Sequence, residues 1–223
     1  HLMARDILKF HAIYWPALLL AAGLPLPRKL YMHGFFTING TKMSKSLGNV
    51  IDPHSLVDRF GKDATRYLLL SQFPFGLDGD IKEELFVEKY NADLANNLGN
   101  LVSRTLNMIE QYTDGRVPKE LPSFIRLDPV RDLITGLDFH QALQKTWQAI
   151  DEANLLIDQH KPWELAKDTS KRGELEKVLS QLAAFLYELA GVLYPFMPDT
   201  AAAIYGSLSA GSITKGKPLF ERK

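Results

Sequence analysis

Two lysines lie three positions apart in a segment that also carries two hydroxyl side chains, Lys42-Met43-Ser44-Lys45-Ser46. An Asn39-Gly40 dipeptide, typical of a tight turn after a strand, precedes this segment. Gly48 follows it and lets the backbone bend close to a ligand. Lysine ammonium groups stabilise the charge that develops on a leaving pyrophosphate. These residue types therefore indicate a polyphosphate-binding loop, with an exposed basic turn as the alternative interpretation.

The charge of the chain is unevenly distributed. Residues 1–60 hold seven Lys and Arg against three Asp, although the 26 basic and 26 acidic residues of the whole chain balance. A basic half suits a polyanionic ligand, but uneven solvated faces give the same imbalance. The charge pattern alone therefore leaves the ligand open.

The composition excludes several classes of protein. Hydrophobic residues make up 46% of the 223 residues and charged residues 23%, which is usual for a globular protein and too apolar for a disordered one. These residues contain no cysteine, which excludes a disulfide scaffold, a cysteine nucleophile and a cysteine zinc site. The lack of cysteine makes a reducing cytoplasm the expected location. No run of 18 apolar residues occurs, so we expect no transmembrane helix and no membrane partner.

The N-terminal part has the pattern of a helix followed by a strand. Apolar residues at steps of three or four predict a helix over residues 5–22, with a kink or break at Pro16. A short buried strand is expected at 30–33, and residues 35–38 continue extended into the Asn39-Gly40 turn. This is half of a βαβ unit, whereas a doubly wound sheet needs several. The chain is therefore expected to begin inside an α/β domain.

The remainder is expected to be almost wholly helical. Gly and Pro residues delimit short helices at 53–60 and 63–71 and a loop near 74–79. The longer helical regions are predicted at 81–112, 130–160, 172–193 and 199–208. Amphipathic helices joined by turns indicate an α-helical bundle, followed by a loop-like tail from residue 208. The fold class is therefore mainly α.

Several segments resemble one family of enzymes. Residues 42–46 resemble the KMSKS signature of class I aminoacyl-tRNA synthetases, and the extension at 47–53 is also typical of them. That signature is shared by several amino-acid specificities. The segments that resemble methionyl-tRNA synthetases of the bacterial type are residues 6–17, 24–27 with 33–35, 91–104 and 161–167. The resemblance covers nearly the whole chain and weakens over 115–135 and after 208.

The resemblance implies two small-molecule subsites. It assigns the methionine pocket to Ile7, His11 and Trp15, which lie at i, i+4 and i+8 on one helix face. An apolar pocket with one polar group suits a thioether, although these positions also suit an ordinary core. For ATP it implies Lys42 and Lys45 as the catalytic residues, Lys45 foremost, and as further binding residues Ser44, His33, Gly34, Phe35 and Asp6.

The resemblance also implies a tRNA site. Asn100 and Arg104 are four residues apart on one helix face, and Trp163 follows a proline at a helix boundary. An amide, a guanidinium and an indole can read and stack an unpaired base. In the family these positions contact the CAU anticodon of tRNA(Met). A polar surface pair with a capping tryptophan is the alternative from spacing alone.

The resemblance gives the chain four parts. Residues 1–50 would be the C-terminal piece of a Rossmann-like catalytic domain with the KMSKS loop, and 51–80 a linking stem-contact region. Residues 81–207 would be the α-helical anticodon-binding domain, and 208–223 a tail. The substrates implied are L-methionine, ATP with Mg²⁺, and tRNA(Met).

Two departures from the family pattern limit these expectations. Ala4-Arg5 stands where the family usually has Gly-Lys, so the charge is kept but the backbone is less free. The family's His-Ile-Gly-His signature and its metal-bearing insertion do not occur in these residues. We therefore expect no metal site in this chain, a need for the missing N-terminal catalytic half, and no activity alone.

Three hypotheses follow. In the first, the chain is the C-terminal part of a methionyl-tRNA synthetase. In the second, it is a non-catalytic tRNA-binding chain or one subunit of a split synthetase. The third is another class I specificity, such as isoleucine or valine. Phe10-His11 and Tyr14-Trp15-Pro16 argue against the third hypothesis.

Overall fold

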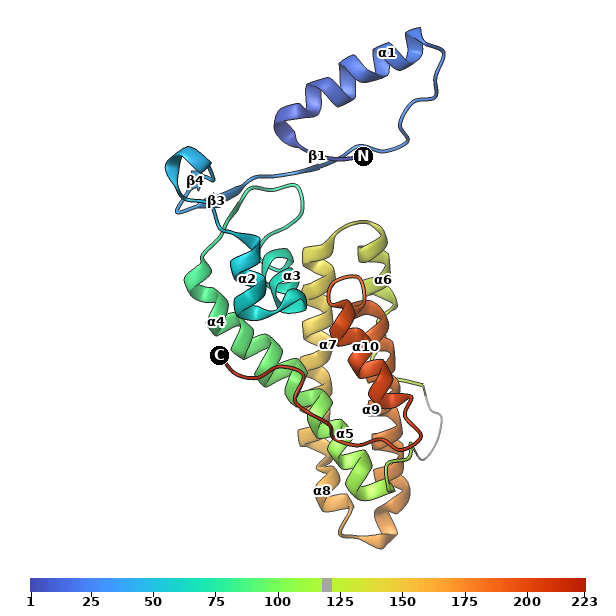
Figure 1. The fold of residues 1–223 in the computed structure, drawn as a ribbon. Helices are drawn as coiled ribbons and strands as arrows, with labels where there is room; N and C mark the ends of the chain where they lie inside the picture. The colour runs from blue at the N-terminus through green and yellow to red at the C-terminus, as the bar shows by residue number, and fades with distance from the viewer. Residues whose placement is uncertain (118–121) are drawn as a thin grey trace. The chain divides into compact units, whose positions relative to one another are not determined.

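The computed structural model describes residues 1–117 and 122–223, with the backbone alone for Lys45 (Figure 1). The described residues form two compact units. Unit 1 consists of His1–Asp52 and Gln72–Glu83, and unit 2 of Pro53–Ser71 and Glu84–Lys223. Each unit is therefore assembled from separate stretches of the chain.

Unit 1 contains two small sheets. In the first, β1 (Leu2–Ala4) pairs in parallel with β2 (Tyr31–His33). In the second, β3 (Phe36–Ile38) pairs with β4 (Thr41–Lys42) on one side and with β5 (Gly79–Asp80) on the other.

The β3–β4 hairpin confirms the turn predicted at Asn39-Gly40. Both residues have positive φ, 51° and 73°, as a two-residue hairpin turn of this kind requires. Strand β5 was not expected, because Pro74, Gly76 and Gly79 predict a loop there.

One helical segment follows β1 in unit 1. It consists of η1 (Arg5–Ile7), the π-helical η2 (Phe10–Tyr14) and α1 (Trp15–Ala21). Of the kink or break expected at Pro16, the break into two helices does not occur, and the helix is irregular just before this residue, in η2. The backbone N–H of Trp15 bonds to the carbonyl of Phe10, five residues back. This wider turn places Pro16 in the first turn of α1, where a proline's missing N–H is tolerated.

Strand β2 was expected to be buried, and this expectation was wrong. Met32 is 38% exposed and His33 is also exposed in the described structure. On the other strand of this sheet, Met3 is buried at 4% exposure. A two-stranded sheet has too few neighbours to cover both of its faces.

Unit 2 is built almost wholly from helices, as expected. Their bounds are α2 (Pro53–Phe60), α3 (Lys62–Leu70), α4 (Phe86–Lys89), η5 (Tyr90–Leu98), α5 (Gly99–Thr113), α6 (Asp128–Thr135), α7 (Phe139–His160), α8 (Pro162–Leu165), η6 (Thr169–Lys171), α9 (Arg172–Leu193) and α10 (Pro198–Leu208). The short 3-10 turn η4 (Glu83–Leu85) precedes α4. The helical region predicted at 130–160 is thus two helices, α6 and α7.

Helices α4, η5 and α5 follow one another without interruption. Apolar residues at steps of three or four along this segment are buried, at Tyr90, Leu94, Leu98 and Leu101. The middle part, η5, is π-helical, which the sequence did not reveal. Its repeated step of four residues suits a turn wider than that of an α-helix.

Helix α9 lies at the centre of unit 2. It packs against α5, α7, α8 and α10. Its side chains Phe185, Leu186 and Leu189 have no exposed surface. In the described parts of the chain, no helix combines the length and apolar character needed to cross a bilayer.

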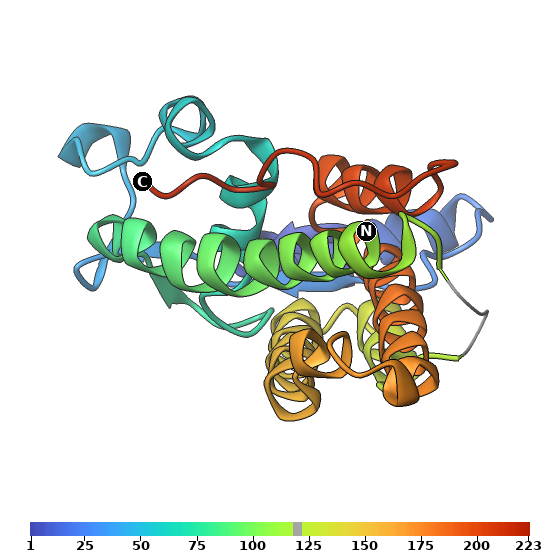
Figure 2. The ribbon, with the colours of Figure 1, turned by 90° about the horizontal axis from the view of Figure 1, so that it is seen from below.

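The tail after α10 is without helix or strand but follows the long helical segment in the opposite direction (Figure 2). The backbone N–H of Ile213 bonds to the carbonyl of Gly115 at 2.8 Å. Near the other end, the backbone N–H of Lys223 bonds to Asn91 Oδ1 at 2.9 Å. The tail is therefore fastened along the helix that carries Asn100.

Asp63 supplies the cap of a helix distant in sequence. Its Oδ2 accepts a 2.6 Å hydrogen bond from the backbone N–H of Thr200, in the first turn of α10, and its side chain is buried. We predict that Asp63→Ala lowers the free energy of unfolding by about 1–3 kcal/mol, because it leaves a buried N–H without an acceptor. Urea unfolding followed by circular dichroism measures this loss.

Asp199→Ala is the matched control. Its carboxylate pairs with Lys62 at 2.7 Å, but both side chains are more than 60% exposed. Loss of such a solvent-screened pair is expected to change the free energy of unfolding much less than loss of the buried cap. Equal losses for the two variants would show that Asp63 is not a structural cap.

Candidate functional site

The predicted nucleotide segment His33-Gly34-Phe35 lies where β2 ends and β3 begins. His33 Nδ1 lies 2.9 Å from the carbonyl oxygen of Gly34. The backbone N–H of Phe35 donates to Asp78 Oδ1 at 2.8 Å, and its carbonyl accepts from the N–H of Gly79 at 2.9 Å. The backbone N–H of Phe35 is thus available to a nucleotide only if the bond to Asp78 is displaced, whereas its carbonyl keeps one lone pair.

Lys42 lies beside this segment. Its ammonium group is 3.9 Å from the centroid of the Phe35 ring, a cation–π distance. The hairpin turn places β4, which ends at Lys42, next to β3. The structure therefore brings together Phe35 and Lys42, two residues for which the sequence predicted a common ligand.

The loop after Lys42 is held by its own polar groups. Asn49 Oδ1 accepts from the backbone N–H of Ser44 at 2.8 Å, and the hydroxyls of Ser44 and Ser46 are 2.7 Å apart. The loop continues through the 3-10 turn η3 (Lys45–Leu47). The side chain of Lys45 lies outside the described structure, so its predicted role stays a prediction.

Sequence reasoning missed Asp78 and Asp80, which lie on either side of Gly79. Asp80 Oδ1 accepts from the backbone N–H of Gly40 at 2.8 Å and from the Thr37 hydroxyl at 2.9 Å. The bond from Gly40 is the main reason that the pKa of Asp80 is below its usual value. The only sequence signal was two carboxylates in a glycine-rich segment, which ordinarily marks a solvated loop.

The three residues predicted to bind methionine, Ile7, His11 and Trp15, lie along one helical segment. His11 Nδ1 is 3.0 Å from the carbonyl oxygen of Ile7. The rings of His11 and Trp15 meet edge to face with centroids 6.1 Å apart. Asp6 is exposed at the start of this helix. The structure thus groups His11 with Ile7 and Trp15 despite the π-helical stretch between them.

In unit 2 the predicted tRNA residues Arg104 and Trp163 also meet. The guanidinium carbon of Arg104 is 5.9 Å from the Trp163 ring centroid, and this tryptophan is 37% exposed. Arg104 Nη2 also donates to Asp158 Oδ1 at 2.6 Å. Sequence reasoning did not find Asp158, because its partner lies on another helix.

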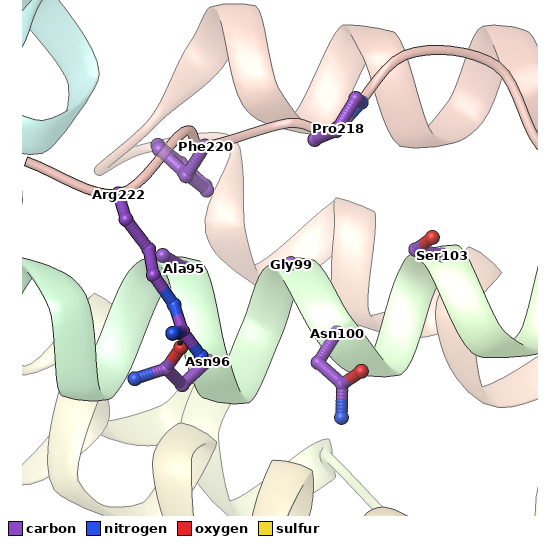
Figure 3. Close-up of a pocket in the computed structure, with 8 residues that line it drawn as sticks. All are labelled: Ala95, Asn96, Gly99, Asn100, Ser103, Pro218, Phe220 and Arg222. Atoms are coloured by element: carbon purple, nitrogen blue, oxygen red, sulfur yellow. Dashed lines mark hydrogen bonds between the residues drawn. The ribbon is translucent and has the colours of Figure 1, made fainter.

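Asn100 lies one turn before Arg104 and lines a pocket of about 360 Å³ (Figure 3). One side of this pocket is the helix, with Asn96, Gly99 and Ser103, and the other side is the tail. Arg222 of the tail donates from Nε to Asn96 Oδ1 at 2.8 Å. The Asn100 amide extends away from the tail in this view.

A larger pocket, of about 580 Å³, lies between α3, η5 and α7. Tyr67 and Trp147 stack there at 4.2 Å, and the Tyr67 hydroxyl donates to Asp93 Oδ2 at 2.6 Å. Burial, then the charge of Asp93, raises the pKa of Tyr67, which keeps this hydroxyl protonated. None of the predicted site residues lines this pocket.

The two groups of residues suit different chemistry. In unit 1, a lysine on an aromatic ring at a strand end can meet a phosphate beside a planar base. In unit 2, an exposed indole, a guanidinium and an exposed amide can bind unpaired RNA. Within residues 1–117 and 122–223, no three His, Asp or Glu side chains gather as metal ligands would.

Comparison with known proteins gives consistent results. The model of the family "tRNA synthetases class I (M)" matches residues 1–106. The methionine–tRNA ligase of Caldanaerobacter subterraneus subsp. tengcongensis is 46% identical over 219 residues, which cover 93% of this chain and 34% of that protein. Methionine–tRNA ligase 1 of Bacillus anthracis is 41% identical over 100% of this chain and 38% of its own length.

Solved structures agree. The crystal structure of Mycobacterium tuberculosis methionyl-tRNA synthetase bound by methionyl-adenylate matches with a TM-score of 0.87 and 32% identity, over 99% of this chain and 49% of that one. A second structure of that synthetase, also with methionyl-adenylate, gives a TM-score of 0.88 and 33% identity over 100% of this chain and 50% of that one. The chain thus spans just over a third of these curated relatives and about half of the solved chains. The family model, the curated relatives and the solved structures all support the methionyl-tRNA synthetase family for this chain.

Proposed function

We propose that this chain is the C-terminal part of a methionine–tRNA ligase, which activates L-methionine with ATP and transfers it to tRNA(Met). In this proposal residues 1–50 end a Rossmann-like catalytic domain, 51–80 link it, 81–207 form a helical anticodon-binding bundle, and 208–223 are a tail. A cytoplasmic location belongs to the same proposal. Its support is that curated methionine–tRNA ligases cover 93–100% of this chain.

The observation that carries the proposal is the contact between Lys42 and Phe35 at the strand end. The proposed reaction is attack of the methionine carboxylate on the α-phosphate of ATP, which releases pyrophosphate with its Mg²⁺. Lys42 and Lys45 would stabilise the charge that develops on this leaving group. Ser44, His33, Gly34 and Asp6 would hold the rest of the nucleotide.

The methionine subsite is proposed along the first helix. Ile7 and Trp15 would surround the methionine side chain, and His11 would be the polar group beside the sulfur. The edge-to-face contact of His11 with Trp15 supports a preformed wall of this kind. A thioether packs favourably against aromatic rings.

The anticodon subsite is proposed on unit 2. Trp163 would stack on an unpaired base, and Arg104 and Asn100 would bind base edges or phosphates of the CAU sequence. The support is that Arg104 and Trp163 are in contact and that all three side chains have surface available to a ligand.

The first test concerns Lys45. In the synthetase that carries this chain, Lys45→Ala is expected to slow methionine-dependent ATP–pyrophosphate exchange. The loss corresponds to about 2–4 kcal/mol of transition-state stabilisation, because this lysine would meet charge mainly in the transition state. The KM for methionine should stay nearly constant.

Lys29→Ala is the control, since it removes a lysine of the same unit outside the proposed site. Steady-state exchange kinetics on both variants separate turnover from methionine binding. A Lys45→Ala enzyme with normal turnover and only a weaker methionine affinity would contradict the proposed role.

The second test concerns Trp163. Trp163→Ala is expected to weaken binding of tRNA(Met) by about 1–3 kcal/mol, because it removes a stacking surface. Adenylation should change little. Binding of tRNAs with a CAU or an altered anticodon, measured at one salt concentration, gives the result.

Tyr194→Ala is a matched control, because Tyr194 is also an exposed aromatic residue of unit 2, at 64% exposure. Arg104→Ala is less informative, since it removes phosphate attraction together with base contacts. If Trp163→Ala keeps the full preference for CAU, this tryptophan is structural and the anticodon assignment is wrong.

A further inference from the structure

The chain returns to the nucleotide segment at residues 77–81. Strand β5 pairs in parallel with β3, and the backbone N–H of Ile81 bonds to the carbonyl of Thr37 at 2.8 Å. This return places Asp78 opposite the start of β3 and Asp80 opposite the hairpin turn. The segment therefore bonds to the backbone of Phe35, a predicted ATP residue, and to that of Gly40, two residues before Lys42.

The approach between the two segments is very close. A Cβ atom at Gly34 would overlap the carbonyl of Leu77, so this position accepts only glycine without a shift of backbone. A Cβ atom at Gly79 would overlap the ring of Phe73. Such close packing fixes Asp78 relative to the strand end.

The carboxylate of Asp78 is held between two donors. Oδ1 accepts from the Phe35 N–H at 2.8 Å, and Arg5 Nη2 lies 2.7 Å from both oxygens. The Arg5–Asp78 pair is about half exposed, so the ion pair by itself contributes little stability. The bond from Phe35 is the main cause that lowers the pKa of Asp78, ahead of Arg5.

The fixed position of Phe35 also restricts the position of the Lys42 ammonium group. Both polar groups of its backbone are bonded to residues 78–79, so the residue has one orientation in the strand. Its ring then supports the Lys42 ammonium at 3.9 Å. A change at Asp78 would therefore alter the place of the Lys42 cation through Phe35, in addition to the weaker direct attraction between the two charges.

We propose that Asp78 is a positioning residue for ATP, which acts through Phe35 to fix the end of the nucleotide strand and the place of Lys42. Asp78 does not contact the nucleotide in this proposal. The inference rests on the proposed ATP site and adds to it a residue from a distant part of the sequence.

The test compares Asp78→Ala with Asp78→Asn in the synthetase that carries this chain. Asparagine keeps an acceptor oxygen for the Phe35 N–H but loses the charge that pairs with Arg5. Alanine removes both. We expect Asp78→Ala to raise the KM for ATP about tenfold, as the loss of one hydrogen bond to a fixed group implies. Asp78→Asn should stay within about threefold of wild type, because an exposed ion pair contributes little.

Two further measurements isolate positioning from folding. The KM for methionine and the melting temperature should change no more than in Asp128→Asn. Asp128 is the matched control: it is an exposed aspartate of unit 2 that accepts from Arg126 at 2.8 Å and 3.0 Å. Calorimetric titration with Mg·ATP reports binding without catalysis.

The outcomes separate the inference from the proposed function. The inference is overturned if Asp78→Ala and Asp78→Asn behave alike, or if both KM values and the melting temperature change together. A wild-type protein that binds Mg·ATP but catalyses no exchange contradicts the proposed function, and a weaker affinity of Asp78→Ala would still support the inference. A wild-type protein that binds no Mg·ATP overturns both.

Discussion

The packing of residues 77–81 against β3 is the contact on which the candidate nucleotide site of unit 1 depends. The glycine at position 34 allows the approach, and the backbone of Phe35 is then bonded on both sides by residues 78–79. Without this return, β3 would have only the two-residue strand β4 as a neighbour in its sheet. A two-stranded hairpin is marginal in water, so the third strand is needed to hold Lys42 at a defined place.

In unit 2 the corresponding constraint is the register between two helical segments, η5 with α5 on one side and α7 on the other. Among the hydrogen bonds that join them are those from Trp147 to Asp93, Asn97 to Asp151, and Arg104 to Asp158, and in each of these the partners are 54 residues apart. A constant separation means that the segments run parallel and do not slip against each other. Arg104 is the last of these three positions. Its orientation is therefore set by the same register that packs the helices, and Trp163 comes just after α7 ends at His160.

The sequence was informative where structure is local. Apolar periodicity and Gly and Pro boundaries predicted most helical segments of unit 2, but not α8 or the division of 130–160 into α6 and α7, and the Asn39-Gly40 dipeptide predicted the hairpin. It did not predict β5, Asp78 or Asp158, because each depends on a partner more than forty residues away. The π-helical stretches were missed because steps of three or four residues do not distinguish them from α-helix. The candidate site residues came from a resemblance and not from physics alone, since an isolated lysine pair or a surface tryptophan has ordinary structural explanations.

The two proposed ligand sites share one electrostatic arrangement. In each, a cation lies on an aromatic ring, Lys42 on Phe35 and Arg104 on Trp163, and a carboxylate bonds to one member of the pair. Cation–π contacts and half-exposed ion pairs are individually weak, because solvent screens them. Contacts of this strength bias the side-chain orientations and leave a phosphate group able to replace them. A polyanion such as ATP or tRNA would therefore meet cations that are already in place, and less side-chain entropy would be lost on binding.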